Sequence, residues 1–526
     1  MKIIPLQCHP GTAAPHSHPG RLIASARLFT DWYGDLDVSS CRVLELGSGY
    51  SENLLPLALS LPNATFVGLE TRRKNCETSR MLAGQVGVDN VSIYPGNDWR
   101  DAENEEAFDV VIVRQPYSSV TVLEQERLLA DCHRFLKPRG LAYIKFDCLP
   151  GARHRQTIRD ALQKASFTAD AVVLDPKAAI DHLEFLGRHT LSSSSSISAK
   201  QTIIDFVSRC KRGVITRNEW ESLLSKHYQP TLLVDFCRLL DKQGLRYRLD
   251  ADVEASLHLD LPDDARDTLA QLNDDPVRQQ QYADFLQNRH ARHAIVSRQG
   301  QHASSATLTQ RLMGLHFRGG VLEVARENTS EFGSSVDFES LQGRRFRCED
   351  PLMIFCLRLI GQAYPNSISF EHMCAEATRV LLEKDDQNMT SADPFMNTIT
   401  TSVSQLIGQG LIQGSLTETS CFSEVSTTPE GYAWARIQAA YGSMVTNVHH
   451  ENLSLENLER ELLRQLNGRK TRPQLEDWLR DYFSHHDLVA VSNGQCLSDN
   501  SKVETQLERW LYNTLKRFGQ QGLLVG

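Results

Sequence analysis

From residue 41 to residue 146, short apolar runs alternate with segments in which apolar residues recur at helical spacing. Each apolar run is short, rich in β-branched or aromatic residues and bounded by turn residues, so five strands are predicted: RVLEL, TFVGLE, VSIYPG, FDVVIV and LAYIKF. The intervening stretches predict helices, and LEQERLLADCHRFLKPRG is expected to end at Pro138 and Gly140. Strands that alternate with helices predict an α/β fold with a parallel, doubly wound, Rossmann-like sheet.

Helical patterns dominate the rest of the chain. An amphipathic helix, a glycine and a short apolar strand recur in LLVDFCRLLDKQGLRYRL, SVSQLIGQGLIQGSL and LERWLYNTLKRFGQQGLLV, and this unit favours winged-helix-like modules. In the third unit Gly519 is expected to end the helix, and Asp350 before Pro351 predicts a helix start. We predict a Rossmann-like domain at 1–165, a helical middle region at 166–300, a β-hairpin plus winged-helix-like domain at 301–440, and a helical or winged-helix-like domain at 441–526.

Composition narrows the class of protein. A chain of 526 residues, 41% hydrophobic and 23% charged, predicts several soluble domains, and no apolar run is long enough to cross a bilayer. The twelve cysteines are scattered without a C-x-x-C pair, which favours reduced thiols in a cytoplasm. The net charge of −9 disfavours a nucleic-acid partner. His16 and His18 lack an evident third ligand, so no metal site is expected.

The stretch LELGSGYSENLLPLALSLPNATFVGLE, residues 44 to 70, carries the candidate chemistry. Gly47 and Gly49 follow the first strand, but Glu52 stands where a dinucleotide fingerprint has its third glycine, and its charge would repel a pyrophosphate. Glu70 ends the second strand, where a carboxylate can accept hydrogen bonds from ribose hydroxyls. A nucleoside without phosphates, with an amino-acid carboxylate at the early helix amides, is favoured. S-adenosylmethionine fits this description.

Two further loops follow predicted strands. Asn97 and Asp98 come after the third strand, where they could hydrogen-bond an adenine amino group. Arg114, Gln115 and Tyr117 follow the fourth strand, at the carboxyl edge where open α/β sheets bind ligands.

Several segments together resemble a known family. They are HSHPGRLIASARLF, the 44–70 stretch, the Tyr-Ser pair at 117–118, Leu-Pro-Gly at 149–151, QQYADFLQNRHARHAIVSR, and ARIQAAYGSMVTNVHHENLSL. The chain is similar to bacterial class I S-adenosylmethionine-dependent methyltransferases that carry a methyltransferase regulatory domain, including protein lysine methyltransferases acting on rickettsial outer-membrane proteins. The resemblance implies a catalytic Rossmann-like domain, a helical middle region, and winged-helix-like modules that hold a protein substrate or build a homodimer.

Methyl transfer to an amine needs an oriented, neutral nucleophile, and this requirement suggests roles for individual residues. Tyr117 is the candidate to orient the acceptor amine, or alternatively packs its ring on the adenosyl side. Asp147 is the candidate to accept the proton, or alternatively is a solvated loop acid. His18 is expected to close over the cofactor rather than to bind a metal. The full set of expected cofactor-binding residues is His18, Glu45, Gly47, Ser48, Gly49, Asn53, Glu70, Thr71, Asn97, Asp98, Arg114 and Gln115.

Two alternative functions remain open at this stage. Ser119 replaces a tryptophan of the family and Asp147 replaces an asparagine, so a cofactor-binding but inactive interaction protein is one alternative. The segment RQPY at 114–117 sits where amino-methyltransferases carry a polar-Pro-Pro-aromatic box, which makes N-methylation of nucleic acid or glutamine the other.

Overall fold

The computed structural model describes residues 11–526 with internal gaps, and the statements below concern the described residues. The residues left out after residue 10 are 33, 35, 97–106, 115–116, 166–175, 191–196, 213–214, 216, 258–260, 273–274, 301–303, 325–334, 342, 385–392, 420, 423–424, 487–490, 493–494 and 497–499.

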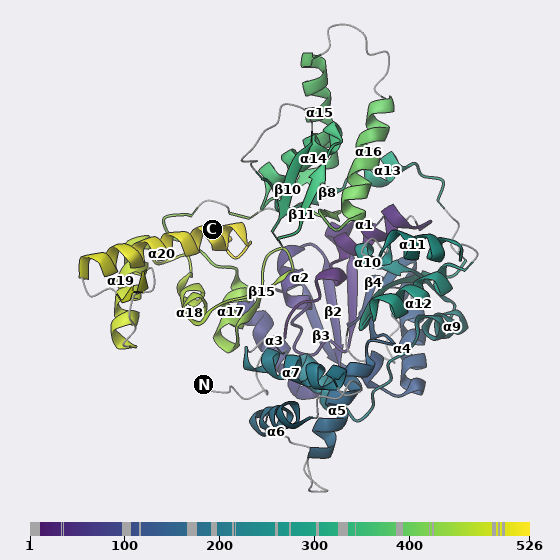
Figure 1. The fold of residues 1–526 in the computed structure, drawn as a ribbon, viewed down its shortest axis with the longest axis horizontal. Helices are drawn as coiled ribbons and strands as arrows, with labels where there is room; N and C mark the ends of the chain where they lie inside the picture. The colour runs from purple at the N-terminus through teal and green to yellow at the C-terminus, as the bar shows by residue number, and fades with distance from the viewer. Residues whose placement is uncertain are drawn as a thin grey trace.

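The centre of the molecule is a seven-stranded sheet with the order β3-β2-β1-β4-β5-β7-β6 (Figure 1). Strands β1 to β5 are parallel, and β7 runs antiparallel to both of its neighbours. The predicted Rossmann-like α/β fold is therefore confirmed. The strands are β1 Arg42–Leu46, β2 Thr65–Glu70, β3 Val91–Pro95, β4 Phe108–Val113, β5 Leu136–Asp147, β6 Leu245–Asp250 and β7 Ala291–Arg298.

The last two strands correct the interpretation of the middle region, which is not only helical. The first helix–glycine–strand unit forms α9 (Leu233–Lys242) and β6, which join the central sheet rather than a winged-helix module. The sheet consequently draws strands from both sides of residue 165, the predicted domain boundary. The antiparallel register of β7 against β5 was not foreseen from the sequence pattern.

Both faces of the sheet are covered by helices. Leu44 and Val111 belong to a core shared with α4 (Val122–Phe135) and α9, whereas Val43 and Ile112 pack with α1 (Pro19–Phe29) and α2 (Leu54–Ser60). Burial on both faces explains why the strand sequences are nearly continuous apolar runs, as parallel strands require.

The helix before β5 ends earlier than predicted. A capping box between Thr121 and Glu124 begins α4, and the helix stops at Phe135, so Pro138 and Gly140 lie inside strand β5. Gly140 is needed there because a Cβ atom would lie 2.8 Å from the Asp109 carbonyl oxygen on the neighbouring strand. The glycine therefore permits close strand approach and does not end the helix.

Four helices after β5 form a small unit of their own, which we call the helical cap. They are α5 (Arg153–Ala165), α6 (Pro176–His189), α7 (Ile197–Lys211) and α8 (Arg217–Leu224), and they share a core that includes Leu162, Leu183, Phe206 and Trp220. In Figure 1, α5, α6 and α7 lie below the sheet.

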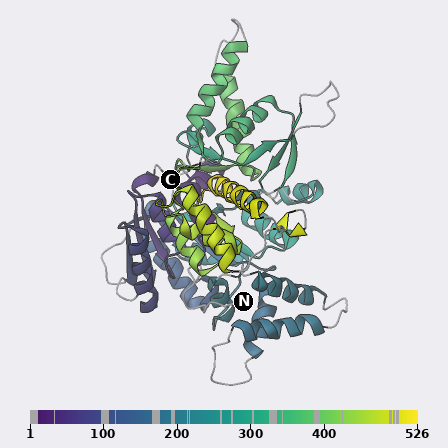
Figure 2. The ribbon, with the colours of Figure 1, turned by 90° about the vertical axis from the view of Figure 1, so that its left-hand side faces the viewer.

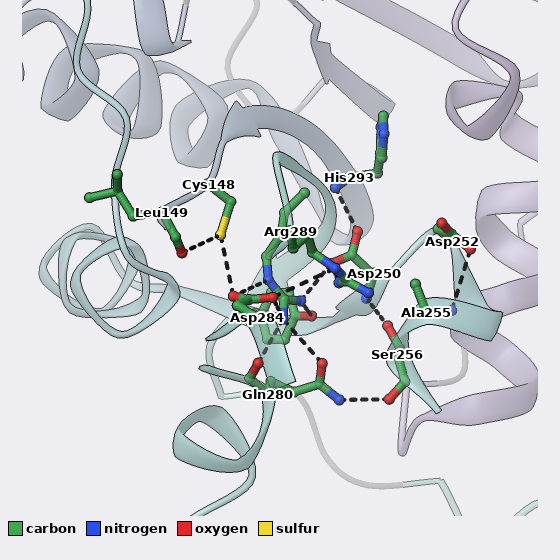
Figure 3. Close-up of polar contacts among 12 residues, drawn as sticks. Cys148, Leu149, Asp250, Asp252, Ala255, Ser256, Gln280, Asp284, Arg289 and His293 are labelled. Carbon is green, nitrogen blue, oxygen red and sulfur yellow. Dashed lines mark hydrogen bonds and ion pairs between the residues drawn. The ribbon is translucent and has the colours of Figure 1, made fainter. Parts of the chain in front are cut away.

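A buried ion network fastens the middle region to the sheet. Arg292 on β7 is fully buried and binds the Asp284 carboxylate through Nη2 at 2.7 Å and the Asp250 carboxylate through Nη1 at 2.6 Å. Arg289 also reaches Asp250, at 3.2 Å, and Asn288 ends α12 (Pro276–Gln287) in the left-handed conformation with φ of 47°. Figure 3 shows Asp250, Asp284 and Arg289 meeting at this point. The segment QQYADFLQNR thus supplies structural contacts.

The domain after the sheet stands at the opposite end from the helical cap (Figure 1). Its helix α14 starts as predicted, because the Asp350 side chain accepts hydrogen bonds from the backbone of Leu352 and Met353. The remaining elements of this and the preceding region are α10 Val253–Ser256, α11 Asp263–Ala270, α13 Leu308–Leu312, β8 His316–Arg318, β9 Val321–Glu323, β10 Val336–Ser340, β11 Arg345–Cys348, α14 Pro351–Ala363, β12 Ile368–Ser369, α15 Phe370–Lys384, α16 Asp393–Gly408 and β13 Gln413–Ser415.

The C-terminal domain packs against the sheet domain. Tyr50 and Leu55 share a core with its buried Trp434 and Leu511, and Figure 2 brings α17–α20 to the front of the molecule. Helix α20 continues past Gly519, and Gly522, with φ of 68°, makes the turn instead. The elements are α17 Ala433–Tyr441, β14 Met444–Thr446, β15 Asn452–Ser454, α18 Asn457–Gln465, α19 Arg472–His485, β16 Val491–Ser492, β17 Gln495–Cys496 and α20 Asn500–Gln520. None of the described helices is both long and apolar enough to span a bilayer.

Candidate active site

A cavity of about 670 Å³ opens at the carboxyl edge of the parallel strands. Gly47, Gly49 and Glu70 line one end, which we call the cofactor end, and Lys145 and Asp147 line the other, the acceptor end. The helical cap, the segment 12–16 and the C-terminal domain complete the wall through Arg155, Arg209, Glu219, Ser222, Ser225, His16 and Asn452. A single cavity therefore joins four separate parts of the chain.

The glycine loop and Glu70 form the cofactor end. Gly47 and Gly49 have positive φ values of 74° and 60°, which glycine adopts without strain. The Glu70 carboxylate accepts hydrogen bonds from the Gly49 amide at 2.9 Å and from the Arg72 amide at 2.8 Å. The Thr71 hydroxyl donates a third, longer hydrogen bond to it at 3.4 Å. A carboxylate has about four lone-pair sites, so these three bonds fix it in place and leave capacity for a ligand hydroxyl. With Thr71 also lining the wall, the residues present fit a nucleoside cofactor such as S-adenosylmethionine.

Arg114 lines the cavity and is held between two buried carboxylates that lie behind the wall. Its Nη2 lies 2.7 Å from Glu52 Oε1, its Nε lies 3.2 Å from Glu45 Oε1, and its Nη1 donates to the Thr12 carbonyl at 2.8 Å. Burial raises the pKa of Glu45 to about 7, although Arg114 opposes that shift. Arg114 lines the cavity as predicted, but Glu45 lies behind it and supports the wall.

Three other predicted cofactor residues do not line the cavity. Ser48 is fully buried, and His18 caps α1, its Nδ1 accepting a hydrogen bond from the Gly20 amide at 3.2 Å. Asn53 Oδ1 accepts from the Ala14 amide at 2.8 Å and lies 2.9 Å from Nε2 of His450. These contacts correct the prediction for His18, which caps α1, and for Asn53, which holds the segment before α1 against the start of α2 and the C-terminal domain. The buried Ser48 hydroxyl has no hydrogen-bond partner among the described residues.

His18 was expected to close over the cofactor, but His16 is the histidine of this segment that reaches the cavity. It lines the cavity, and its ring centroid lies 5.0 Å from that of His293 on β7. Tyr143 Oη in turn lies 2.7 Å from His293 Nδ1. Burial lowers the pKa of His293 to about 3, with smaller contributions from His16 and Lys145. The part of the wall that His16 and His293 form therefore carries neutral imidazole rings near neutral pH.

The predicted acceptor-orienting role of Tyr117 is contradicted by its position. Its ring is fully buried against Phe146 and Phe236, and its hydroxyl has no hydrogen-bond partner among the described residues. Burial also raises the pKa of the Tyr117 hydroxyl. Tyr117 is a core residue, and Ser118 next to it lines the cavity instead.

The acceptor end carries charged side chains from β5 and the helical cap. Asp147, the expected proton acceptor, lines this end of the cavity, and its Oδ2 lies 3.6 Å from Arg155 Nη1. Arg209 binds Glu219 at 2.9 Å. Lys145 was missed, although its position two residues before Asp147 on a predicted strand places both side chains on one face.

The remaining predictions lie outside what the structure describes. Asn97, Asp98 and Gln115 belong to the segments left out, so their role in cofactor binding stays a prediction. Within the described ranges, no group of three or more His, Cys, Asp and Glu side chains is arranged to hold a metal ion.

Three family descriptions match successive parts of the chain. "Methyltransferase domain" matches residues 37–185, "Predicted methyltransferase regulatory domain" matches 222–298, and "PKMT, C-terminal winged helix domain" matches 428–523. The first match covers the glycine loop, Glu70 and the carboxyl edge that form the cavity. The chain is an S-adenosylmethionine-dependent methyltransferase.

Relatives of similar length support this architecture. The methyltransferase is 24% identical to the uncharacterized protein RP789 of Rickettsia prowazekii over 511 residues, which is 93% of this chain and 88% of that protein. Its fold matches PKMT2 from Rickettsia typhi, also solved in complex with AdoHcy, with a TM-score of 0.79 and 20% identity over 99% of this chain and 100% of that one. A shorter relative, ribosomal RNA small subunit methyltransferase G of Chlorobium limicola, is 30% identical over 23% of this chain and 50% of its own.

The Glu70→Gln variant is expected to bind S-adenosylmethionine about 10- to 100-fold more weakly, because hydrogen bonds to a charged acceptor contribute about 1.5–3 kcal/mol. Titration calorimetry on the purified full chain measures this affinity. Glu77→Gln, an exposed position on α3 (Arg73–Val86), is the matched control and should bind as the wild type does. Equal affinity of Glu70→Gln and the wild type would contradict the assignment of Glu70 to the cofactor.

Proposed function

We propose that this methyltransferase transfers a methyl group to the side-chain amine of a lysine on a bacterial protein. The observation that carries the proposal is the acceptor end of the cavity, where Lys145, Asp147 and Arg155 line a recess covered by the helical cap. A lysine side chain is long, thin and cationic, so it suits a recess whose wall contains the Asp147 carboxylate. The net charge of −9 also favours a protein over the phosphates of nucleic acid.

The proteins that this chain resembles also support a protein as the acceptor. The C-terminal domain matches a family described as the winged helix domain of PKMT, and the similar solved structure is titled PKMT2. On this proposal the C-terminal domain presents the protein substrate, because it also contributes Asn452 to the cavity wall and fixes the segment before α1.

On this proposal the two ends of the cavity have different roles in the reaction. Gly47, Gly49 and Glu70 would hold the cofactor, which when bound supplies a methyl group on a sulfonium centre. The acceptor end would orient the amine nitrogen toward that centre, and such alignment accounts for much of the acceleration in a displacement reaction. The helical cap contributes Arg155, Arg209 and Glu219 to the wall around the acceptor.

The test is transfer of radiolabel from methyl-tritiated S-adenosylmethionine into a bacterial cell extract by the purified full chain. A band that resists nuclease but is lost to protease is expected, and acid hydrolysis of it should release methylated lysine. Label lost to nuclease would instead favour nucleic acid as the acceptor. Absence of label from a chain that still binds the cofactor would favour the inactive binding protein.

A further inference from the structure

Lys145 faces the cavity from near the carboxyl end of β5. Tyr143, Lys145 and Asp147 alternate along this strand and all three line the cavity. The antiparallel register pairs Lys145 directly with His293 on β7. Directly opposed residues in such a pair have Cβ atoms about 4.5–5.5 Å apart, so the amine and the imidazole share one wall.

Lys145 differs from the arginines around it in having no counter-ion. Arg114 and Arg209 each bind a carboxylate within 3 Å, and Arg155 lies 3.6 Å from Asp147. The half-buried Lys145 forms no hydrogen bond or ion pair with any side chain that the structure describes. Its Nζ is therefore the amine of the acceptor end that is not already committed to another residue.

The surroundings of Lys145 shift its protonation equilibrium toward the neutral amine. Burial is the largest cause that lowers the pKa of Lys145, Arg155 and Arg114 lower it further, and Asp147 and Glu219 oppose them. The charged and titratable groups around Nζ come from each packed element: Asp147 on β5, Arg155 on α5, Arg114 after β4, Glu219 on α8 and His293 on β7.

We propose that the neutral Lys145 amine accepts the proton of the incoming acceptor ammonium and is the catalytic base of the reaction. Asp147, the base expected from the sequence, forms an ion pair with Arg155 at 3.6 Å, whereas Lys145 has no such partner among the described residues. The inference rests on an amine acceptor, which is the proposed function.

The proton passes from the acceptor nitrogen to Lys145 Nζ, which frees the acceptor lone pair. The nitrogen then forms a bond to the methyl carbon as the carbon–sulfur bond breaks and its electron pair stays on sulfur. Lys145 returns its proton to solvent before the next cycle, and the product leaves as a methylated ammonium.

Two substitutions of Lys145 distinguish a role as a general base from a role as a fixed positive charge. Lys145→Met and Lys145→Arg should each lower kcat by about 100-fold or more near neutral pH, because general bases contribute factors of this order. Their rates should keep rising with pH toward about 10.4, where free lysine loses its proton, whereas the wild-type rate levels off earlier. Wild-type activity in Lys145→Arg would overturn the proposal, since a guanidinium cannot accept the proton.

Lys137→Met is the matched control. Lys137 lies on the same strand, outside the cavity, with Nζ 2.9 Å from Asp109. The control should keep the wild-type pH profile, and all variants should bind S-adenosylmethionine as the wild type does in calorimetry. Loss of cofactor binding in Lys145→Met would assign Lys145 to the cofactor rather than to the acceptor and would overturn the proposal.

A second measurement does not need the acceptor. Competitive acetylation of the whole protein by isotopically labelled acetic anhydride over a pH series reports when each lysine becomes nucleophilic. Lys145 should react at lower pH than Lys137. If Lys145 titrates with the surface lysines while protein is still methylated, the base assignment alone is overturned. If Lys145 reacts early and no protein is ever labelled, the proposed function fails instead.

Discussion

Replacing Arg292 by methionine is expected to lower the free energy of unfolding by about 3–5 kcal/mol, because removing one partner of a buried ion pair leaves uncompensated charge. Asp250 and Asp284 are both almost fully buried, and without Arg292 they would face each other with only Arg289 nearby. Urea unfolding followed by circular dichroism measures the loss. Hydrogen exchange should show that β6 and β7 loosen first.

Two further variants sharpen this test. Arg238→Met removes an exposed arginine paired with Asp235 three residues earlier, and such surface changes usually stay within about 0.5 kcal/mol. Adding Asp284→Leu to Arg292→Met should recover part of the lost stability, because apolar side chains can replace a buried ion pair. Unfolding of Arg292→Met at the wild-type urea concentration would show that the network contributes no stability.

The second large effect is expected from Arg114→Met. Glu45 and Glu52 are 0% and 1% exposed, and both depend on this guanidinium for charge compensation. We expect a loss of about 3–5 kcal/mol in stability. Cofactor affinity should fall as well, because Glu52 also accepts the Tyr50 amide at 2.9 Å and thereby shapes the glycine loop. Calorimetry and urea unfolding measure the two effects separately.

The pH dependence of this variant has a defined sign. The folded-state pKa of Glu45 is raised to about 7, so its contribution to stability is fully present below the unfolded-state pKa and is lost as pH rises through 7. Removing the cation favours the neutral carboxyls further, and the deficit of Arg114→Met should therefore grow with pH. Glu45→Gln is the control: it can still accept from Arg114, and it should remove the wild-type loss of stability on approach to pH 7. A deficit independent of pH would contradict this account.

Residues that lie close together in the sequence form most of the cofactor end of the cavity. Gly47, Gly49, Glu70 and Thr71 all line the cavity at the edge where the cofactor was expected, because a strand, a tight turn and the end of the next strand are encoded within thirty residues of one another. Arg114 and Asp147 line the same cavity, since residues that end parallel strands meet at one edge of the sheet. The roles of these residues toward the cofactor and the acceptor stay predictions.

The failures concern residues whose surroundings come from distant segments. Tyr117 was expected at the acceptor, but Phe236 of α9 encloses its ring in the core. His18 and Asn53 were expected at the cofactor, but the C-terminal domain brings His450 against Asn53, and the segment before α1 turns His16 toward the cavity. A polar residue in a promising loop has no fixed role until its tertiary partners are known.

The sequence alone determined the alternation of strands and helices, the glycine loop with its acidic partner, and the absence of a dinucleotide fingerprint, because these depend on residues close together in the chain. The tertiary structure alone decided that β7 lies beside β5. The two strands are about 150 residues apart in the sequence, so their pairing is set by the packing of the whole sheet. That pairing places His293 against Lys145 and Tyr143, and the helical cap adds Arg155, Arg209 and Glu219 to the wall of the same cavity. The nature of the acceptor end is therefore a property of the assembled fold.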